Sequence, residues 1–254
     1  MQQLDLPTNL THWTDRPVLA FDLETTGTDP ETDRIVTACA VLVWPDGTTS
    51  GQHSWLVNPG VEIPEAAAAV HGVTTATAQV SGQDAAETID QICKVLTVNM
   101  VDGRPIAAYN ASFDLTLLHR EAARHGYSWH LHTLRKAKVL DPLVIDRRQD
   151  RYRRGKRTLG VCCDHYGVPL DNAHEASADA IAAGRLVWKL RAAFPHLPEM
   201  SLDELHALQT RWHADWAADF EAFLHRQGKT DAFIDDQWPI RDLPETSEGA
   251  ADVA

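Results

Sequence analysis

Two acidic side chains end a short apolar segment near the N-terminus. In PVLAFDLE (17–24), Asp22 and Glu24 follow the apolar run VLAF and precede the small residues TTG. If this segment is a strand, residues two apart project from the same face, so both carboxylates lie together at the strand's carboxyl end. Carboxylates held close together repel each other, and a divalent cation relieves that repulsion. The pair therefore predicts a metal site, which the apolar flank favours over two merely solvated acids.

Two further aspartates and one histidine complete the set of candidate residues. Asp114 and Asp179 each fall in the first turn of a predicted helix, where an acid more often only stabilises the helix dipole. His174 lies five residues before Asp179 in a loop, where most histidines are surface residues. Taken together, four carboxylates and one histidine are the donor set of a two-metal phosphoryl-transfer site. Such a site holds two Mg²⁺ or Mn²⁺ ions about 3.5–4 Å apart.

The spacing of apolar residues predicts the elements that position these groups. The predicted strands cover 17–24, 35–44, 50–59, 105–110 and 139–146, with a hairpin from 35 to 58. The predicted helices cover 84–98, 158–166, 178–194 and 201–227, with one more after residue 110 that Ser112 would cap and a short one that breaks at Gly72. This order predicts an α/β layered domain with a mixed sheet, a hairpin first and crossover helices after it.

Pro195 and Pro198 interrupt the chain and suggest its division. We expect an N-terminal tail over 1–15, the α/β domain over 16–194, a helical extension over 195–228 and a flexible acidic tail over 229–254. An apolar stripe marks the extension, and packing of this stripe on the domain is favoured over a contact with a partner. The stripe consists of Leu205, Leu208, Trp212, Trp216, Phe220 and Phe223.

The composition excludes several classes of protein. The 254 residues, 44% hydrophobic and 23% charged, fit one globular domain with a small annex. No run approaches the roughly 20 apolar residues of a membrane-spanning helix, and MQQLDLPTNLTHW lacks the basic start and apolar stretch of a signal peptide. The four cysteines form no CxxC pair, which disfavours a disulfide framework or a zinc site and favours the cytoplasm.

Positive charge gathers in one short segment of an acidic chain. The formal net charge is -13, yet residues 133–157 hold 10 basic and 3 acidic residues. Its arginines include Arg151, Arg153 and Arg154, with Tyr152 between them. A solvated surface is the simple interpretation of a charge run. Arginines interleaved with an aromatic also suit contact with a nucleic-acid backbone and stacking on bases, which is the interpretation we favour.

Four segments of the sequence resemble a known family in their order and spacing. FDLETTG (21–27), IPEAAAAVHGVT (63–74), NASFD (110–114) and HEASAD (174–179) resemble the motifs of the DEDD superfamily of exonucleases. The His-x4-Asp spacing of HEASAD is similar to the histidine branch, which includes the proofreading epsilon subunit of bacterial DNA polymerase III, oligoribonuclease and RNase T. The resemblance covers about residues 16–192. It implies a ribonuclease H-like fold.

The resemblance also implies a role for each matching residue. Asp22, Glu24, Asp114 and Asp179 would hold two metal ions, and His174 would be the general base that takes a proton from the attacking water. The residues implied to contact the substrate or to shape its site are Thr25, Thr26, Gly27, His71, Asn110 and Phe113. For His71 a structural role has equal weight, and Asn110 and Phe113 would mainly fix the geometry of their motif.

These observations predict a metal-dependent 3′–5′ exonuclease that releases nucleoside 5′-monophosphates from single-stranded ends, with DNA favoured. The alternatives are trimming of RNA ends by the same chemistry and a nucleic-acid-binding module without activity. QLDLP (3–7) resembles the peptides that bind the bacterial sliding clamp, although Pro7 replaces their aromatic anchor, and QWPIRDL (237–243) is a weaker match. A polymerase or clamp partner is thus one expectation and a plain tail the other, and the oligomeric state is not predicted.

Overall fold

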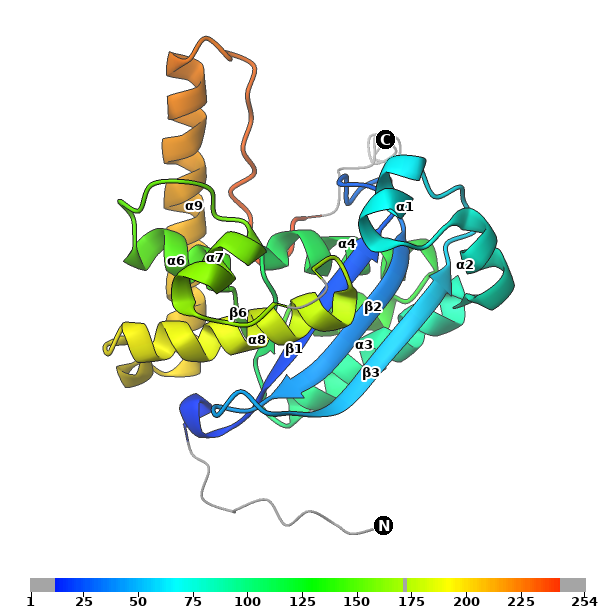
Figure 1. Ribbon diagram of the computed structural model, residues 1–254, viewed down its shortest axis with the longest axis horizontal. Coiled ribbons are helices and arrows are strands. Elements are labelled where there is room, and N and C mark those ends of the chain that lie inside the picture. The colour runs from blue at the N-terminus through cyan, green and yellow to red at the C-terminus, as the bar shows by residue number, and fades with distance from the viewer. Residues whose placement is uncertain (1–11, 171–172, 243–254) are drawn as a thin grey trace, which may run out of the picture.

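The computed structural model describes residues 12–170 and 173–242 as a mixed sheet with helices on both faces (Figure 1). Its strand order is β4-β3-β2-β1-β5-β6. The strands are β1 (Val18–Thr25), β2 (Ile35–Val43), β3 (Thr49–Asn58), β4 (Gln83–Asp84), β5 (Ile106–Ala107) and β6 (Val139–Leu140). Strands β1, β2 and β3 pair antiparallel, whereas β5 is parallel to both β1 and β6. The predicted mixed α/β sheet with an initial hairpin is confirmed.

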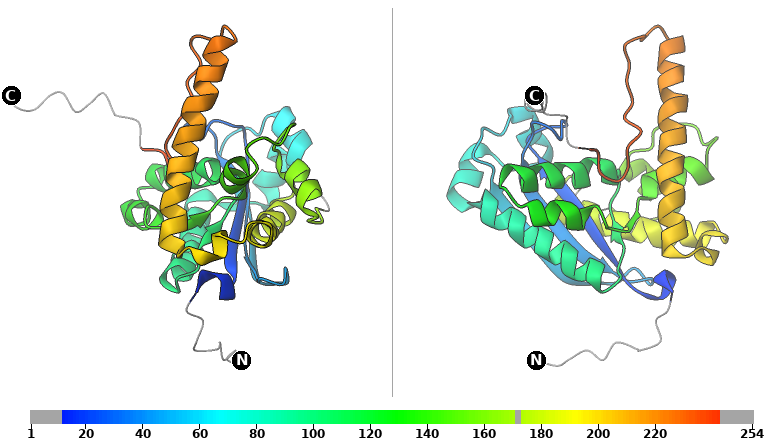
Figure 2. Two further views of the ribbon diagram at one scale, coloured as in Figure 1. Left: turned by 90° about the vertical axis from the view of Figure 1, so that its left-hand side faces the viewer. Right: turned by 180° about the vertical axis from the view of Figure 1, so that it is seen from behind.

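Helices cover both faces of this sheet (Figures 1 and 2). They are α1 (Glu65–His71), α2 (Thr75–Ser81), α3 (Ala85–Val101), α4 (Ala111–Arg124), α5 (Ser128–Leu134), α6 (Pro142–Gln149), α7 (Leu159–Tyr166), α8 (Ala176–Ala193) and α9 (Leu202–Arg226). Helices α3, α4 and α5 lie behind the sheet in the view of Figure 1, and α8 lies in front of it. No helix of the described part of the chain is long and apolar enough to span a membrane. All four cysteines are free and buried.

The alternation of β1 decides where its acids point. Leu19 and Phe21 belong to the core that packs on α3 and α4, whereas Val18 and Ala20 belong to the core beneath α8. Side chains two apart share a face of a strand, so Asp22 and Glu24 continue the face that α8 covers. Helix α8 lies close to the sheet, because a Cβ on Gly184 would come within 2.6 Å of the Val43 side chain. The acids of β1 therefore emerge at the start of α8.

The predicted strand over 139–146 is wrong beyond its first two residues. Strand β6 ends at Leu140, and α6 begins at Pro142 with Asp141 as its N-cap. An aspartate cap followed by proline at the first helical position is a strong start signal for a helix, and it overrides the apolar run that follows. Ser112 does not cap α4 either, since it is buried inside a helix that begins at Ala111.

The chain after residue 229 is not a loose tail over its described part. Trp238 and Ile240 are buried in the same core as α3 and α4. The Arg120 side chain donates hydrogen bonds to the carbonyls of Arg241 and Asp242, at 3.2 and 2.5 Å. Two apolar side chains and a buried arginine therefore fix this segment, although its sequence shows no periodicity. Trp238 and Ile240 of QWPIRDL are thus buried, QLDLP lies outside the described residues, and contact of either segment with a clamp stays a prediction.

Helix α9 packs on the domain through its first half and projects beyond it through its second half (Figures 1 and 2). Leu205 is fully buried, as expected for the stripe, and Trp212 contacts both main cores. Phe220 and Phe223, further along, are 37% and 46% exposed. The prediction that the stripe packs on the domain is therefore correct only for the first half of the helix.

Candidate active site

The four predicted carboxylates meet at the carboxyl end of β1. Asp22 and Glu24 come from β1, and Asp114 and Asp179 come from the first turns of α4 and α8. Burial raises the pKa of Asp22 well above its usual range, and the charges of Asp114, Asp179 and Glu24 raise it further. Each of these negative charges therefore opposes the ionisation of Asp22. The fold therefore brings together the four carboxylates that the sequence analysis identified as candidate metal ligands.

Asp114 links α4 directly to β1. Its side chain is 4% exposed, and its Oδ1 atom accepts a hydrogen bond from the Leu23 backbone N–H at 3.1 Å. Burial raises its pKa well above the usual range, although its backbone hydrogen bonds lower it in part. The bond to Leu23 fixes the Asp114 carboxylate against the backbone of β1.

Glu24, His174 and Asp179 form the more open side of the cluster. One potential ligand atom from each lies within 4.8 Å of the others. The Asp179 Oδ2 atom accepts a hydrogen bond from the His174 backbone N–H at 3.3 Å, and His174 itself is exposed with a left-handed φ of 72°. A non-glycine residue in that region is uncommon, and such strain concentrates at functional positions.

The donor set fits divalent cations. Burial, followed by the charge of Asp179, raises the pKa of Glu24 to about 7. Burial also raises the pKa of Asp179, whose Oδ1 atom is buried without a hydrogen-bond partner among the described residues. A buried carboxylate oxygen without a donor is costly, and hard cations such as Mg²⁺ prefer oxygen ligands. The cluster thus provides what a metal site of this class requires.

Asp141 supports the helix that carries Asp114, and the sequence analysis did not identify it. This residue is 1% exposed, and its carboxylate accepts the backbone N–H groups of Asn110, Ala111 and Leu143 at 2.9–3.0 Å. It also accepts the Trp238 indole N–H at 3.3 Å. One carboxylate therefore caps α4, which carries Asp114, and α6 together. The only local signal is the Asp-Pro pair that starts α6.

A pocket of about 360 Å³ opens beside the cluster. Glu24, His71 and His174 line it together with apolar side chains that include Trp55, Leu56 and Val73. The His71 Nδ1 atom accepts the Val73 backbone N–H at 3.2 Å, and its Nε2 atom is buried without a partner in the described part of the chain. Burial lowers the pKa of His71. The His71 imidazole is therefore held by the backbone in the wall of the pocket.

Polar side chains at the end of β1 and in the loop after it form hydrogen bonds with one another and with the loop backbone. The Thr26 hydroxyl donates to the Asp33 carboxylate at 2.8 Å, and the Thr25 hydroxyl donates to the Gly27 carbonyl at 2.5 Å. A Cβ on Gly27 would lie 2.5 Å from the Asp33 carboxylate, so a larger residue would displace the side chain that binds Thr26. The Thr26 side chain is buried in the loop, and contact of Thr25, Thr26 and Gly27 with a substrate stays a prediction. Asn110 has a left-handed φ of 63°, and Phe113 packs against the core, so both shape the start of α4.

The basic segment divides into internal and external arginines. The Arg153 side chain pairs with Asp146 at 2.6 Å and with Asp150 at 3.1 Å, and Arg157 also pairs with Asp146, which is buried. Arg153 therefore stabilises the loop, which corrects its prediction as a substrate-binding residue. Arg151 and Arg154 are exposed, with Arg151 pairing at 2.9 Å with Asp219 of α9.

Comparison with known proteins relates this geometry to one family. The exonuclease family RNase T matches residues 19–187. The DNA polymerase III subunit epsilon-like protein of Rhodobacter capsulatus is 37% identical over 179 residues, which are 69% of this chain and 24% of that protein. The 3′-5′ exonuclease DinG of Bacillus subtilis is 23% identical over 214 residues, covering 84% of this chain and 22% of that protein.

The fold has solved counterparts. Escherichia coli exonuclease I, in complex with a dT13 oligonucleotide, superposes with a TM-score of 0.60 at 21% identity, covering 72% of this chain and 43% of that one. At this identity the likeness shows the fold alone. The chain spans only 11–24% of the length of the curated relatives it matches.

Proposed function

This chain belongs to the RNase T exonuclease family, and we propose that it removes nucleoside 5′-monophosphates from single-stranded 3′ ends with the help of two divalent cations. The observation that carries this proposal is the meeting of Asp22, Glu24, Asp114 and Asp179 with His174 at one edge of the sheet, beside an open pocket. A nucleic-acid-binding module without activity would have no use for four carboxylates that repel one another.

The four carboxylates would hold Mg²⁺ or Mn²⁺, and such ions would supply stabilisation of the phosphoryl oxygens and a more acidic bound water. His174 would take the proton of the attacking water, since histidine is the side chain that exchanges protons near neutral pH. Its exposed position on the loop before α8 gives it access to solvent and to an incoming strand.

The pocket of about 360 Å³ would receive the terminal nucleotide. Trp55, Leu56 and Val73 give it an apolar wall for a base, and Glu24 and His174 lie at the reacting side. His71, whose Nδ1 atom accepts the Val73 backbone N–H, would help to shape the wall of this pocket. Asp141 acts through Asp114 as a positioning residue, because it fixes the first turn of α4.

DNA is the favoured substrate because the relatives named above include a DNA polymerase III epsilon-like protein and an exonuclease I complex with a DNA oligonucleotide. Trimming of RNA ends uses the same chemistry and is the alternative. Digestion of matched 5′-labelled DNA and RNA strands in Mg²⁺, in Mn²⁺ and in EDTA distinguishes the two. We expect a ladder of shortened DNA products that EDTA abolishes. Full-length label in every lane would contradict the proposal.

Partners follow only indirectly from this function. The activity would serve replication or repair in the cytoplasm, with a polymerase or the sliding clamp as its partner. The candidate contact is QLDLP, Gln3 to Pro7. Co-migration of the protein with the clamp in gel filtration, lost when residues 1–11 are removed, would support it, and separate migration would exclude it.

A further inference from the structure

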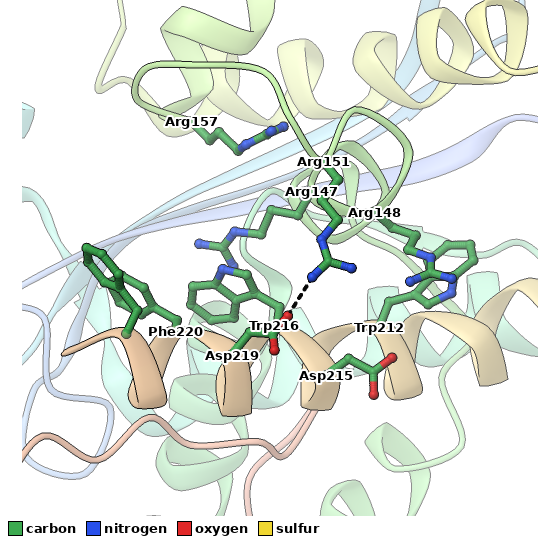
Figure 3. Close-up of a pocket in the computed structure, with 10 residues that line it drawn as sticks. Arg147, Arg148, Arg151, Arg157, Trp212, Asp215, Trp216, Asp219 and Phe220 are labelled. Atoms are coloured by element: carbon green, nitrogen blue, oxygen red, sulfur yellow. Dashed lines mark hydrogen bonds and ion pairs between the residues drawn. The ribbon is translucent and has the colours of Figure 1, made fainter. Parts of the chain in front are cut away.

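A second pocket, of about 290 Å³, lies between α6 and α9, and none of the four carboxylates of the cluster lines it (Figure 3). We call it the aromatic–arginine pocket. The exonuclease chemistry makes no use of it, and it joins the basic segment to the aromatic stripe. Four arginines, among them Arg148 and Arg151, line it together with four aromatic residues, among them Phe220 and Phe223, and the two acids Asp215 and Asp219.

The aromatic side of this pocket is a ladder of nearly parallel rings along α9. The ring centroids of Trp216 and Phe220 are 5.4 Å apart with an interplanar angle of 15°. Those of Phe220 and Phe223 are 6.2 Å apart at 14°. Phe220 and Phe223 remain 37% and 46% exposed at the part of α9 that projects from the domain. Exposed rings in one orientation provide surfaces on which bases can stack.

The opposite side of the pocket carries positive charge. The Arg147 guanidinium lies 3.5 Å from the centroid of the Trp216 ring, which orients both groups. Arg148 is exposed and lies beside Trp212 (Figure 3). The Arg151 side chain meets Asp219 at 2.9 Å, but both side chains are more than half exposed, so this ion pair is weak and exchangeable. A phosphate can replace Asp219 at little cost.

We propose that the aromatic–arginine pocket binds the body of the single strand whose 3′ end lies in the carboxylate site. Bases would stack on Phe220 and Phe223 while phosphates pair with Arg148 and Arg151. The inference rests on the proposed function and adds to it a second contact on the same substrate. The charge distribution favours it, because this is the one strongly basic segment in a chain of net charge -13.

An acidic peptide with an aromatic side chain would also complement such a surface. Two observations favour the strand. Phe220 and Phe223 are both exposed, so two bases of one strand can each stack on a ring. Arg148 and Arg151 are both exposed and line the same pocket, so two phosphates of that strand can each pair with a guanidinium group.

The test compares a dinucleotide, which is too short to occupy both sites, with a long oligonucleotide. For Phe220→Ala/Phe223→Ala, the KM for the long strand should rise about tenfold, as loss of a stacked base predicts, with kcat for the dinucleotide as in the wild type. For Arg148→Gln/Arg151→Gln, the salt dependence of long-strand binding should fall by about 0.7 in log–log slope per arginine. Trp129→Ala and Arg211→Gln are the matched controls, because both residues are exposed elsewhere.

Binding of a labelled long oligonucleotide in EDTA, followed by fluorescence anisotropy, separates this inference from the proposed activity. Weaker binding by both double variants, with the controls unchanged, supports the pocket whether or not the protein degrades DNA. Unchanged binding and an unchanged KM, with normal cleavage of the dinucleotide, would overturn it and leave an acidic peptide as the occupant to test. Failure of the wild type to cleave any strand would refute only the proposed function.

Discussion

Replacing Glu24 with glutamine should stabilise the metal-free protein at alkaline pH. Burial and the nearby Asp179 charge raise the pKa of Glu24 from 4.5 to about 7 in the folded state. The folded state therefore favours the protonated form of Glu24. The free energy of unfolding is highest below the pKa of the unfolded state and falls as the pH rises through about 7, because Glu24 then ionises in the folded protein. Ionised Glu24 is therefore a cost that the protein bears unless a cation offsets it.

The size of this cost follows from the shift in pKa. One pKa unit corresponds to about 1.4 kcal/mol, so the limiting value is about 3 kcal/mol, and the partial exposure of Glu24 lowers it to roughly 2 kcal/mol. In a domain of this size, 1 kcal/mol changes Tm by roughly 2–4 °C. Glu24→Gln should therefore raise Tm by about 4–8 °C at pH 8, and by little at pH 5.

Thermal unfolding in EDTA at the two pH values measures this effect, with Glu62→Gln as a control for an exposed acid. Excess Mg²⁺ should reverse the order, because the wild-type cluster then binds cations that the variant binds less well. If Glu24→Gln melts at or below the wild-type temperature at pH 8 in EDTA, the carboxylates do not repel one another as inferred.

Three further substitutions test the surroundings of the site. Asp141→Asn should lower the free energy of unfolding by about 3 kcal/mol, since an amide cannot accept all four N–H groups, and an unchanged urea midpoint would contradict this role. Trp238→Ala should cost about 3–5 kcal/mol by the same assay, and a loss no larger than that of the exposed Phe233→Ala would disprove its burial. His174→Ala should lower kcat about 10²–10⁴-fold with little effect on KM, and an unaltered kcat would exclude it as the base.

Local patterns predicted the cluster because each of its members lies next to a strong local signal. The period of two along β1 is enough to place Asp22 and Glu24 on one face. Asp114 and Asp179 follow the starts of helices that show clear periodicity or clear motifs. The order of strands and helices then leads to the correct class of sheet. Contacts between segments that are distant in the sequence could not be predicted from these local patterns.

Tertiary contacts explain the errors. Asp141 caps a helix that begins 30 residues earlier, and no local pattern encodes that pairing. Trp238 is held in the core partly by its indole N–H, which donates a hydrogen bond to the same Asp141 carboxylate. Arg153 lies in a run of like charges, which predicts an exposed surface, but a single buried acid, Asp146, turns its side chain inward. Asp141 and Trp238 depend on partners far away in the sequence, and Arg153 depends on the burial of Asp146, which the run of charges does not reveal.

The central claim is that the four carboxylates form a catalytic metal site. The most direct test measures the rate at which Asp22→Asn shortens a 5′-labelled single strand in Mg²⁺. Asp46→Asn, in the exposed turn between β2 and β3, is the control. We predict a rate about 10³-fold below wild type for Asp22→Asn, which corresponds to several kcal/mol of lost transition-state stabilisation, and a normal rate for the control. A wild-type rate for Asp22→Asn would contradict the assignment of the site.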